Sequence, residues 1–161
     1  MLVKDARGNK LLEVIQVDEV QSMKLYQPVT HALVVVKVED DYLLGWNHWR
    51  KNWETFGGCI DAGENLRECI IREGFEELGL EDVEYTWLGL MHFELVPDYF
   101  SPEHREEFGG LYGVTLSSEQ FAEALKNRTD EEEIEQLAFY SKIENKDKIV
   151  AIDEKLLEFW K

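Results

Sequence analysis

The chain has 161 residues, which is enough to bury a hydrophobic core and fits one domain. Hydrophobic residues make up 44% of it, which excludes an intrinsically disordered protein, and a formal net charge of −17 argues against a nucleic-acid partner, because that role needs a basic surface. No apolar run reaches the length of a membrane span and the N-terminus lacks the apolar core of a signal peptide, so we expect a cytoplasmic protein with no membrane partner.

The first third of the chain is predicted to be mostly extended. Residues 1–28 read as an N-terminal hairpin extension with a turn around Arg7-Gly8-Asn9, and this hairpin is a candidate element for a homodimer. His31–Val38 is almost entirely apolar, which is typical of a central strand covered on both faces. An acidic turn leads into a second strand at Tyr42–Trp46. The residues Trp46–Trp53 then form a loop rich in aromatic and basic side chains.

The clearest helix is predicted for Asn65–Leu78. Asn65 is a good N-cap, and Glu68 stands three residues later, as in a capping box. Gly79 is placed where a glycine in the left-handed conformation would end the helix.

The rest of the chain alternates extended and helical segments. In chain order we expect an extended aromatic-rich segment at Val83–Val96, a charged excursion at Pro97–Glu107 and a strand at Phe108–Leu116. A short helix at Ser118–Lys126, a strand at Ile134–Tyr140 and a closing amphipathic helix at Ile152–Trp160 should follow. Strands mixed with three helices at these spacings indicate a sheet flanked by helices in a single α/β domain.

Three glutamates lie on one face of the predicted helix. At about 100° per residue, Glu73, Glu76 and Glu77 fall within one arc, and each close pair would repel by roughly 3 kcal/mol at an effective dielectric near ~20. Protonation of one carboxyl or a divalent cation would relieve this repulsion, and hard oxygen ligands favour Mg²⁺ or Mn²⁺. The alternative is a solvated acidic face, and the other acidic run, Asp130–Glu133, is interpreted as such a surface.

Spacing distinguishes between these alternatives. The segment Gly58–Leu80 resembles the Nudix box, G-x₅-E-x₇-R-E-U-x-E-E-x-G-U, in which U is an apolar residue. All of its fixed letters match, and they fall on Gly58, Glu64, Arg72, Glu73, Glu76, Glu77 and Gly79. The sequence differs from the family pattern at two positions, neither of which is a ligand position. Gly74 occupies the first U position, and Phe56 replaces the proline that often precedes the glycine pair.

The resemblance implies a Nudix-like mixed β-sheet flanked by helices, an α/β (α+β) fold, and an enzyme that hydrolyses acid anhydrides. Its reaction would be the Mg²⁺-dependent attack of water on the diphosphate of a small nucleotide-type metabolite. The family's metal ligands carry over onto the Gly58 carbonyl, Glu73, Glu76 and Glu77. Arg72 and Glu64 are expected to orient this cluster rather than to bind the metal.

Two further sets of residues are candidates for the site. The general base varies within the family, and Glu106, Glu107 and Glu119 are candidates, with Glu107 favoured because it immediately precedes the predicted strand at Phe108. Ordinary solvated carboxylates are the alternative. A substrate-binding loop could stack a base and hold a phosphate through Trp46, Trp49, Arg50, Lys51 and Trp53, although a packed loop would have the same composition.

Two other functions stay open beside hydrolysis. Isopentenyl diphosphate isomerase shares the fold and a related box, but the cysteine-bearing loop before its helix has no counterpart here, since Cys59 lies inside the glycine turn. A non-catalytic Nudix domain that binds nucleotides is the other alternative; such domains usually lose a box glutamate, and this chain keeps them all. The substrate is left open because specificity lies in the loops.

Overall fold

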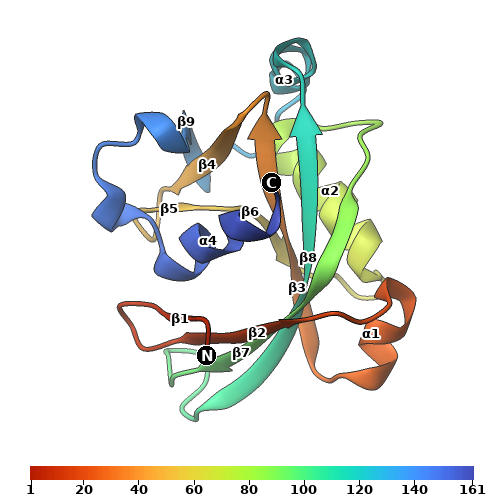
Figure 1. The fold of residues 1–161 in the computed structure, drawn as a ribbon, viewed down its shortest axis with the longest axis vertical. Coiled ribbons are helices and arrows are strands. Elements are labelled where there is room, and N and C mark those ends of the chain that lie inside the picture. Colours follow the sequence, from red (N-terminus) through yellow and green to blue (C-terminus); the bar gives the residue numbers. More distant parts are fainter.

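The computed structural model describes residues 1–161 and is built on one mixed β-sheet with helices on both faces (Figure 1). The strands are β1 (Val3–Lys4), β2 (Lys10–Ile15), β3 (Val29–Val38), β4 (Asp41–Asn47), β5 (Asn52–Glu54), β6 (Phe56–Cys59), β7 (Thr86–Leu95), β8 (Arg105–Leu116) and β9 (Ile134–Phe139). The helices are α1 (Glu19–Leu25), α2 (Leu66–Leu78), α3 (Ser118–Leu125) and α4 (Ala151–Leu156). None of them combines the length and the apolar character needed to cross a lipid bilayer.

The strands follow the order β1-β2-β7-β8-β3-β4-β5. β3 and β8 run parallel, and the other neighbours run antiparallel, so the sheet is mixed as the family resemblance implied. One edge of β3 is shared between two partners, because residues 31–34 pair with β6 and residues 36–38 pair with β4. The sheet therefore divides at this edge, and the β6 branch leads directly into α2 (Figure 1).

Two hydrophobic cores cover opposite faces of the sheet, and β3 contributes to both. Val34 and Val36 lie in the core that contains α2, whereas Val35 lies in the core that α4 closes, because successive side chains of a strand point to opposite faces. Burial of each such side chain stabilises the fold by about 1.5–3 kcal/mol. The predicted apolar strand is therefore central, and the predicted single α/β domain with flanking helices is confirmed.

Local signals set both ends of α2. The Asn65 side chain accepts from the Glu68 backbone N–H at 2.8 Å, and the Glu68 carboxylate accepts from the Asn65 backbone N–H at 3.0 Å. Gly79 ends the helix at φ 71°, and its N–H donates to the Phe75 carbonyl at 2.8 Å. The capping box and the terminal glycine are both confirmed.

Gly74, the departure from the box pattern, makes room for a neighbouring aromatic side chain. The Tyr85 hydroxyl lies where a Cβ at position 74 would stand, so any larger residue there would collide with it. The small residue thus lets Tyr85 pack directly against the backbone of α2.

The N-terminal segment differs in part from the prediction. The hairpin is present as β1 and β2, but α1 follows it, capped by the Asp18 side chain, which accepts from the Gln21 backbone N–H at 3.1 Å. A helix of 7 residues is too short to show a clear apolar periodicity, which is why the sequence pattern missed it. β2 pairs along β7, so the hairpin is an integral edge of the sheet, and its part in a homodimer stays a prediction.

Two element boundaries also differ. β8 begins at Arg105, not at Phe108, because its pairing with β7 continues to Leu95 opposite Arg105, so Glu106 and Glu107 lie within a strand. The loop predicted between β4 and β5 is shorter than expected, because the two strands pair with each other almost to the turn.

Candidate active site

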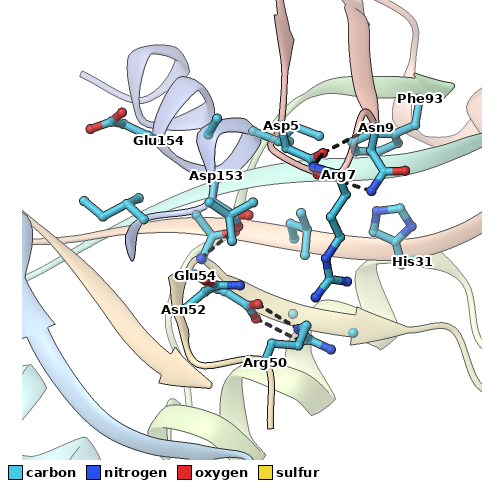
Figure 2. A pocket seen from close by; sticks show the side chains of 18 of the residues that line it. Asp5, Arg7, Asn9, His31, Arg50, Asn52, Glu54, Phe93, Asp153 and Glu154 are labelled. Atoms are coloured by element: carbon cyan, nitrogen blue, oxygen red, sulfur yellow. Dashed lines mark hydrogen bonds and ion pairs between the residues drawn. The ribbon is translucent and has the colours of Figure 1, made fainter. Parts of the chain in front are cut away.

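A cavity of about 980 Å³ opens beside the C-terminal half of α2 (Figure 2). Its walls come from the β1–β2 turn, from β3 with β5 and β6, from α2, from β7, and from residues 146–154 near the C-terminus. That volume is at the upper end of the range usual for small-molecule sites, about 300–1,000 Å³. Segments distant in sequence therefore meet around one space.

Glu73 and Glu77 face this cavity from α2. Glu77 is only 2% exposed, and one of its oxygens accepts from the Gly57 backbone N–H at 2.8 Å. Gly58 packs so closely on the Glu73 carboxylate that a Cβ would not fit between them. Burial raises the pKa of Glu73 and, more strongly, that of Glu77. Two buried or half-buried carboxylates and the Gly58 backbone therefore meet at one wall.

Further carboxylates reach the same point from the loop before β9. One carboxylate oxygen from each of Glu77, Asp130 and Glu133 lies within 4.8 Å of the other two. The Asp130 backbone N–H donates to the Glu76 carbonyl at 2.8 Å, which fixes this loop on the end of α2.

The prediction of a solvated surface for Asp130–Glu133 is therefore wrong for its two end residues. Glu131 and Glu132 are exposed, whereas Asp130 and Glu133 are partly buried beside Glu77. Burial and the nearby Asp130 raise the pKa of Glu133. The loop turns inward through its contact with α2, a tertiary contact that local composition does not reveal.

The donor set fits a hard divalent cation. Carboxylate oxygens of Glu77, Asp130 and Glu133 lie close together, and Glu73 and Gly58 line the cavity beside Glu77. Carboxylate and carbonyl oxygens are the ligands that Mg²⁺ and Mn²⁺ prefer. Like charges so close together in a partly buried place are costly unless a proton or a cation compensates them. These residues can therefore hold a divalent metal.

Glu76 lies differently from its two neighbours in the box. Its side chain is 43% exposed, stands 3.5 Å from the Arg72 guanidinium and does not line the cavity. One helical turn aligns Glu73 with Glu77, while Glu76 is rotated toward solvent. The structure thus brings together two of the three glutamates predicted to bind the metal.

The guanidinium of Arg72 is saturated by contacts within the box. Nε donates to Glu64 at 2.7 Å, Nη1 donates to Glu73 at 2.8 Å, and Nη2 donates to the Cys59 carbonyl at 2.9 Å. These pairs raise the pKa of Arg72, and the Arg72 contact lowers the pKa of Glu64. Because its N–H groups are occupied within the protein, Arg72 cannot also bind a substrate phosphate. These contacts hold the carboxylates of the box in place, as an orienting role for Arg72 and Glu64 requires.

The glutamates predicted as general bases lie outside the cavity. Glu107 accepts from the Thr30 hydroxyl and from Arg105 Nε, both at 3.1 Å, and Glu106 pairs with a histidine of β7 at 2.9 Å. Glu119 lies in the first turn of α3. Glu133 is the loop glutamate that does line the cavity. It directly precedes β9, so the rule that favoured Glu107, a glutamate placed just before a predicted strand, could also have found Glu133.

Of the five residues predicted to bind substrate from the loop Trp46–Trp53, only Arg50 lines the cavity. Arg50 donates to the buried Glu54 through Nε at 2.7 Å and Nη2 at 2.8 Å, and this pair raises the pKa of Arg50. Trp46 and Trp53 pack edge to face with their ring centroids 5.2 Å apart, as the packed-loop alternative expected. The other predicted residues are exposed outside the cavity: Trp49 and Lys51.

Several cavity residues have no counterpart among the predicted site residues. Arg7 and Asn9 come from the hairpin turn, Phe93 comes from β7, and His31 is a partly buried residue of β3 whose pKa is lowered by desolvation. Asp153 comes from α4. No local motif marks any of them, because tertiary packing alone brings these segments together.

Comparison with known proteins assigns the chain to a family. The family model described as the NUDIX domain matches residues 26–159. No curated protein matches the chain.

Solved structures share the fold. The Bacillus subtilis pyrophosphohydrolase BsRppH has a TM-score of 0.64 at 17% identity, over 93% of this chain and 85% of that one. The MutT NUDIX hydrolase from Burkholderia pseudomallei has a TM-score of 0.60 at 19% identity, over 83% and 98%. The NUDIX domain of Shewanella oneidensis NrtR, solved with ADP ribose, has a TM-score of 0.58 at 14% identity, over 89% and 96%.

Proposed function

The chain belongs to the Nudix family, and from that premise we propose that it is a hydrolase of pyrophosphate bonds that uses Mg²⁺, or Mn²⁺, to cleave the diphosphate of a nucleotide-type metabolite. The observation that carries the proposal is the meeting of Glu73, Glu77 and the Gly58 backbone at the wall of a cavity large enough for such a molecule. Asp130 and Glu133 add oxygen donors at the same wall.

A divalent cation held by Glu73 and Glu77, with the Gly58 carbonyl, would neutralise phosphate charge and activate water. The residues of the chain hold this arrangement in place. The Gly57 N–H fixes the Glu77 carboxylate, and Arg72 fixes Glu73. Such fixed positions keep the reacting groups aligned without reorganisation during the reaction.

We propose Glu133, in place of Glu107, as the carboxylate that takes the proton of the attacking water. Glu133 lines the cavity beside Glu77, whereas Glu107 is engaged by Thr30 and Arg105 outside it. Water forms the new bond to phosphorus, its proton passes to Glu133, and the bridging P–O bond breaks with the electron pair leaving on the departing phosphate oxygen.

The acidic walls of the cavity support a requirement for metal. Most of the charged side chains that line it are carboxylates, and Arg50 is already paired with Glu54. An anionic substrate needs a positive charge that the polypeptide supplies only sparingly, and a bound divalent cation provides it. Removal of divalent metal should therefore abolish both turnover and most of the substrate affinity.

A substrate panel tests the proposal. The purified chain is incubated with Mg²⁺ and nucleoside triphosphates, nucleotide sugars, ADP-ribose, dinucleoside polyphosphates, CoA and isopentenyl diphosphate, and the products are separated chromatographically. Hydrolysis that EDTA stops and Mg²⁺ restores is the expected result. An isomerised prenyl diphosphate would favour the isomerase instead, and a thermal shift without turnover would favour a binding domain.

A further inference from the structure

Three basic side chains line the cavity, and they differ in what they contact. Arg50 is held by two hydrogen bonds to Glu54, and Lys146 donates from Nζ to the Ile143 carbonyl at 2.9 Å and to a second backbone carbonyl. Arg7 makes a hydrogen bond only through its backbone N–H, and its guanidinium has neither a hydrogen-bond partner nor an ion pair. In a protein of net charge −17, a cavity arginine without a carboxylate partner is unexpected.

The turn that carries Arg7 is held rigidly. The Asp5 carboxylate accepts from the backbone N–H groups of Arg7 and Asn9, both at 2.9 Å, and from the Asn9 side-chain amide at 3.2 Å. Asn9 in turn accepts from the Val96 N–H at 3.0 Å, which ties the turn to the end of β7. The Asp5 carboxylate, two residues from Arg7 in the chain, is thus used by the turn and forms no ion pair with the Arg7 guanidinium.

The side chain of Arg7 points inward. Figure 2 shows it reaching from the hairpin turn into the cavity, with its guanidinium end directed toward Arg50. The residue is exposed, so a ligand entering the cavity can reach its donors. Fixed backbone and free donors together are the properties of a group arranged for a ligand rather than for the fold.

We infer that Arg7 is a substrate-binding residue whose guanidinium donates to phosphate oxygens of the diphosphate substrate. Guanidinium groups match phosphate oxygens with two parallel hydrogen bonds, and the carboxylate-rich wall beside Glu73 and Glu77 cannot supply this contact. The inference rests on the proposed function and deepens it. Residue 7 lies outside residues 26–159 matched by the family model, so the N-terminal hairpin of this chain completes the binding site.

Replacement of Arg7 tests this role. The variants are R7A, R7K and, as a matched control, K4A, because Lys4 is an exposed basic residue of the same hairpin that does not line the cavity. Calorimetry measures the affinity of each for imidodiphosphate, a non-hydrolysable diphosphate, in the presence of Mg²⁺. Steady-state kinetics gives KM and kcat on the best substrate of the panel.

We expect R7A to weaken imidodiphosphate binding by about 10- to 100-fold, as for loss of hydrogen bonds between charged groups. KM should rise by a similar factor with little change in kcat, because the contact holds ground state and transition state alike. R7K should fall between R7A and the wild type, and K4A should match the wild type. The thermal midpoint of R7A should equal that of the wild type, since the guanidinium forms no hydrogen bond or ion pair within the fold.

Three results would overturn the inference. They are unchanged affinity in R7A, an equal loss in R7A and K4A, and no binding of imidodiphosphate by the wild type. Binding needs no turnover, so the two proposals can fail separately. If the wild type binds imidodiphosphate but hydrolyses nothing in the panel, the proposed hydrolysis fails. The imidodiphosphate affinities of R7A, K4A and the wild type still decide whether Arg7 binds the diphosphate.

Discussion

The two sides of the cavity differ in how their charges are paired. On the side of β6 and α2, Arg72 donates to Glu64, Glu73 and the Cys59 carbonyl, and its donors are all used inside the protein. On the side of the hairpin, the Arg7 guanidinium forms no hydrogen bond and no ion pair. The first side is a closed network that fixes carboxylates in position, and the second presents free donors to whatever enters.

This difference separates two tasks that a hydrolase of charged metabolites must perform. Positions that hold reacting groups need every rotamer locked, which the saturated Arg72 network provides. Positions that recognise a ligand must leave hydrogen-bonding capacity unused until the ligand arrives, which is the state of Arg7. Substitutions on the first side should therefore alter kcat and stability, and substitutions on the second should alter affinity.

The largest effect is expected from Glu77→Gln. Because Glu77 is buried at the cavity wall, loss of its charge should lower kcat at saturating Mg²⁺ by more than the about 10- to 100-fold typical of outer partners of a metal site. Glu76→Gln is the matched control, and its smaller effect should reflect an exposed side chain outside the cavity. An equal loss in both variants would show that Glu76 joins the site when metal and substrate bind, and circular dichroism confirms that each variant is folded.

The next effect is expected from Arg72→Ala. Without the guanidinium, Glu73 and Glu64 lose their common partner, so kcat should fall by about 10- to 100-fold, and the free energy of unfolding should fall by about 1–3 kcal/mol. Urea denaturation and steady-state kinetics measure the two changes. Arg7→Ala is the comparison on the other side of the cavity, and a similar loss of stability there would remove the distinction between the two arginines.

Gly74→Ala tests whether packing behind α2 fixes the first side of the cavity. The added methyl group would meet the Tyr85 hydroxyl, so the free energy of unfolding should fall by about 1–3 kcal/mol although alanine favours a helix over glycine by about 1 kcal/mol. Tyr85→Phe removes that hydroxyl, which is buried without a partner, and should restore the stability of the Gly74→Ala variant. If the double variant is no more stable than Gly74→Ala alone, the clash is not the cause.

The smallest effect concerns Asp153 on the side opposite α2. Its carboxylate accepts from the Thr55 N–H at 2.9 Å and also from the Thr55 hydroxyl, but burial raises its pKa from 3.8 to about 6. The folded state therefore binds the proton more tightly than the unfolded state, and the stability from this group, present below pH ~4, is lost as the pH rises through about 6.

Asp153→Asn removes that titration. Relative to this variant, the free energy of unfolding of the wild type, measured by thermal or urea denaturation, should fall by on the order of 2 kcal/mol between pH ~4 and pH ~7. The asparagine oxygen can still accept from Thr55, which makes the variant a suitable reference. A constant difference between the two proteins across this range would contradict the raised pKa.

The positions of the helices and strands followed from local patterns to a large extent. The α2 helix has its stop and start signals within a few residues of its ends, and the apolar run of β3 marks a strand buried on both faces. The short helix α1 was not predicted because its few residues show no periodicity. β8 begins earlier than predicted because its pairing with β7 extends it. Strand ends depend on the neighbouring strand, which no local pattern contains.

The site divides in the same way. By itself the sequence determined the box: the spacing places Glu73 and Glu77 one helical turn apart, and it brings Arg72 to Glu64 and Glu73, because these residues belong to one helix and the turn before it. Only the tertiary structure decided that Glu133 lies at the cavity and that Glu107 does not.

The tertiary structure likewise decided that Arg7 reaches the cavity. The hairpin and α2 are separated by about a third of the chain, and their meeting depends on how β2 pairs along β7 and how the sheet divides at β3. Catalytic spacing within one helix is fixed by covalent geometry and hydrogen bonding over a few residues. Recognition across the cavity depends on packing between distant segments, which only the folded chain brings together.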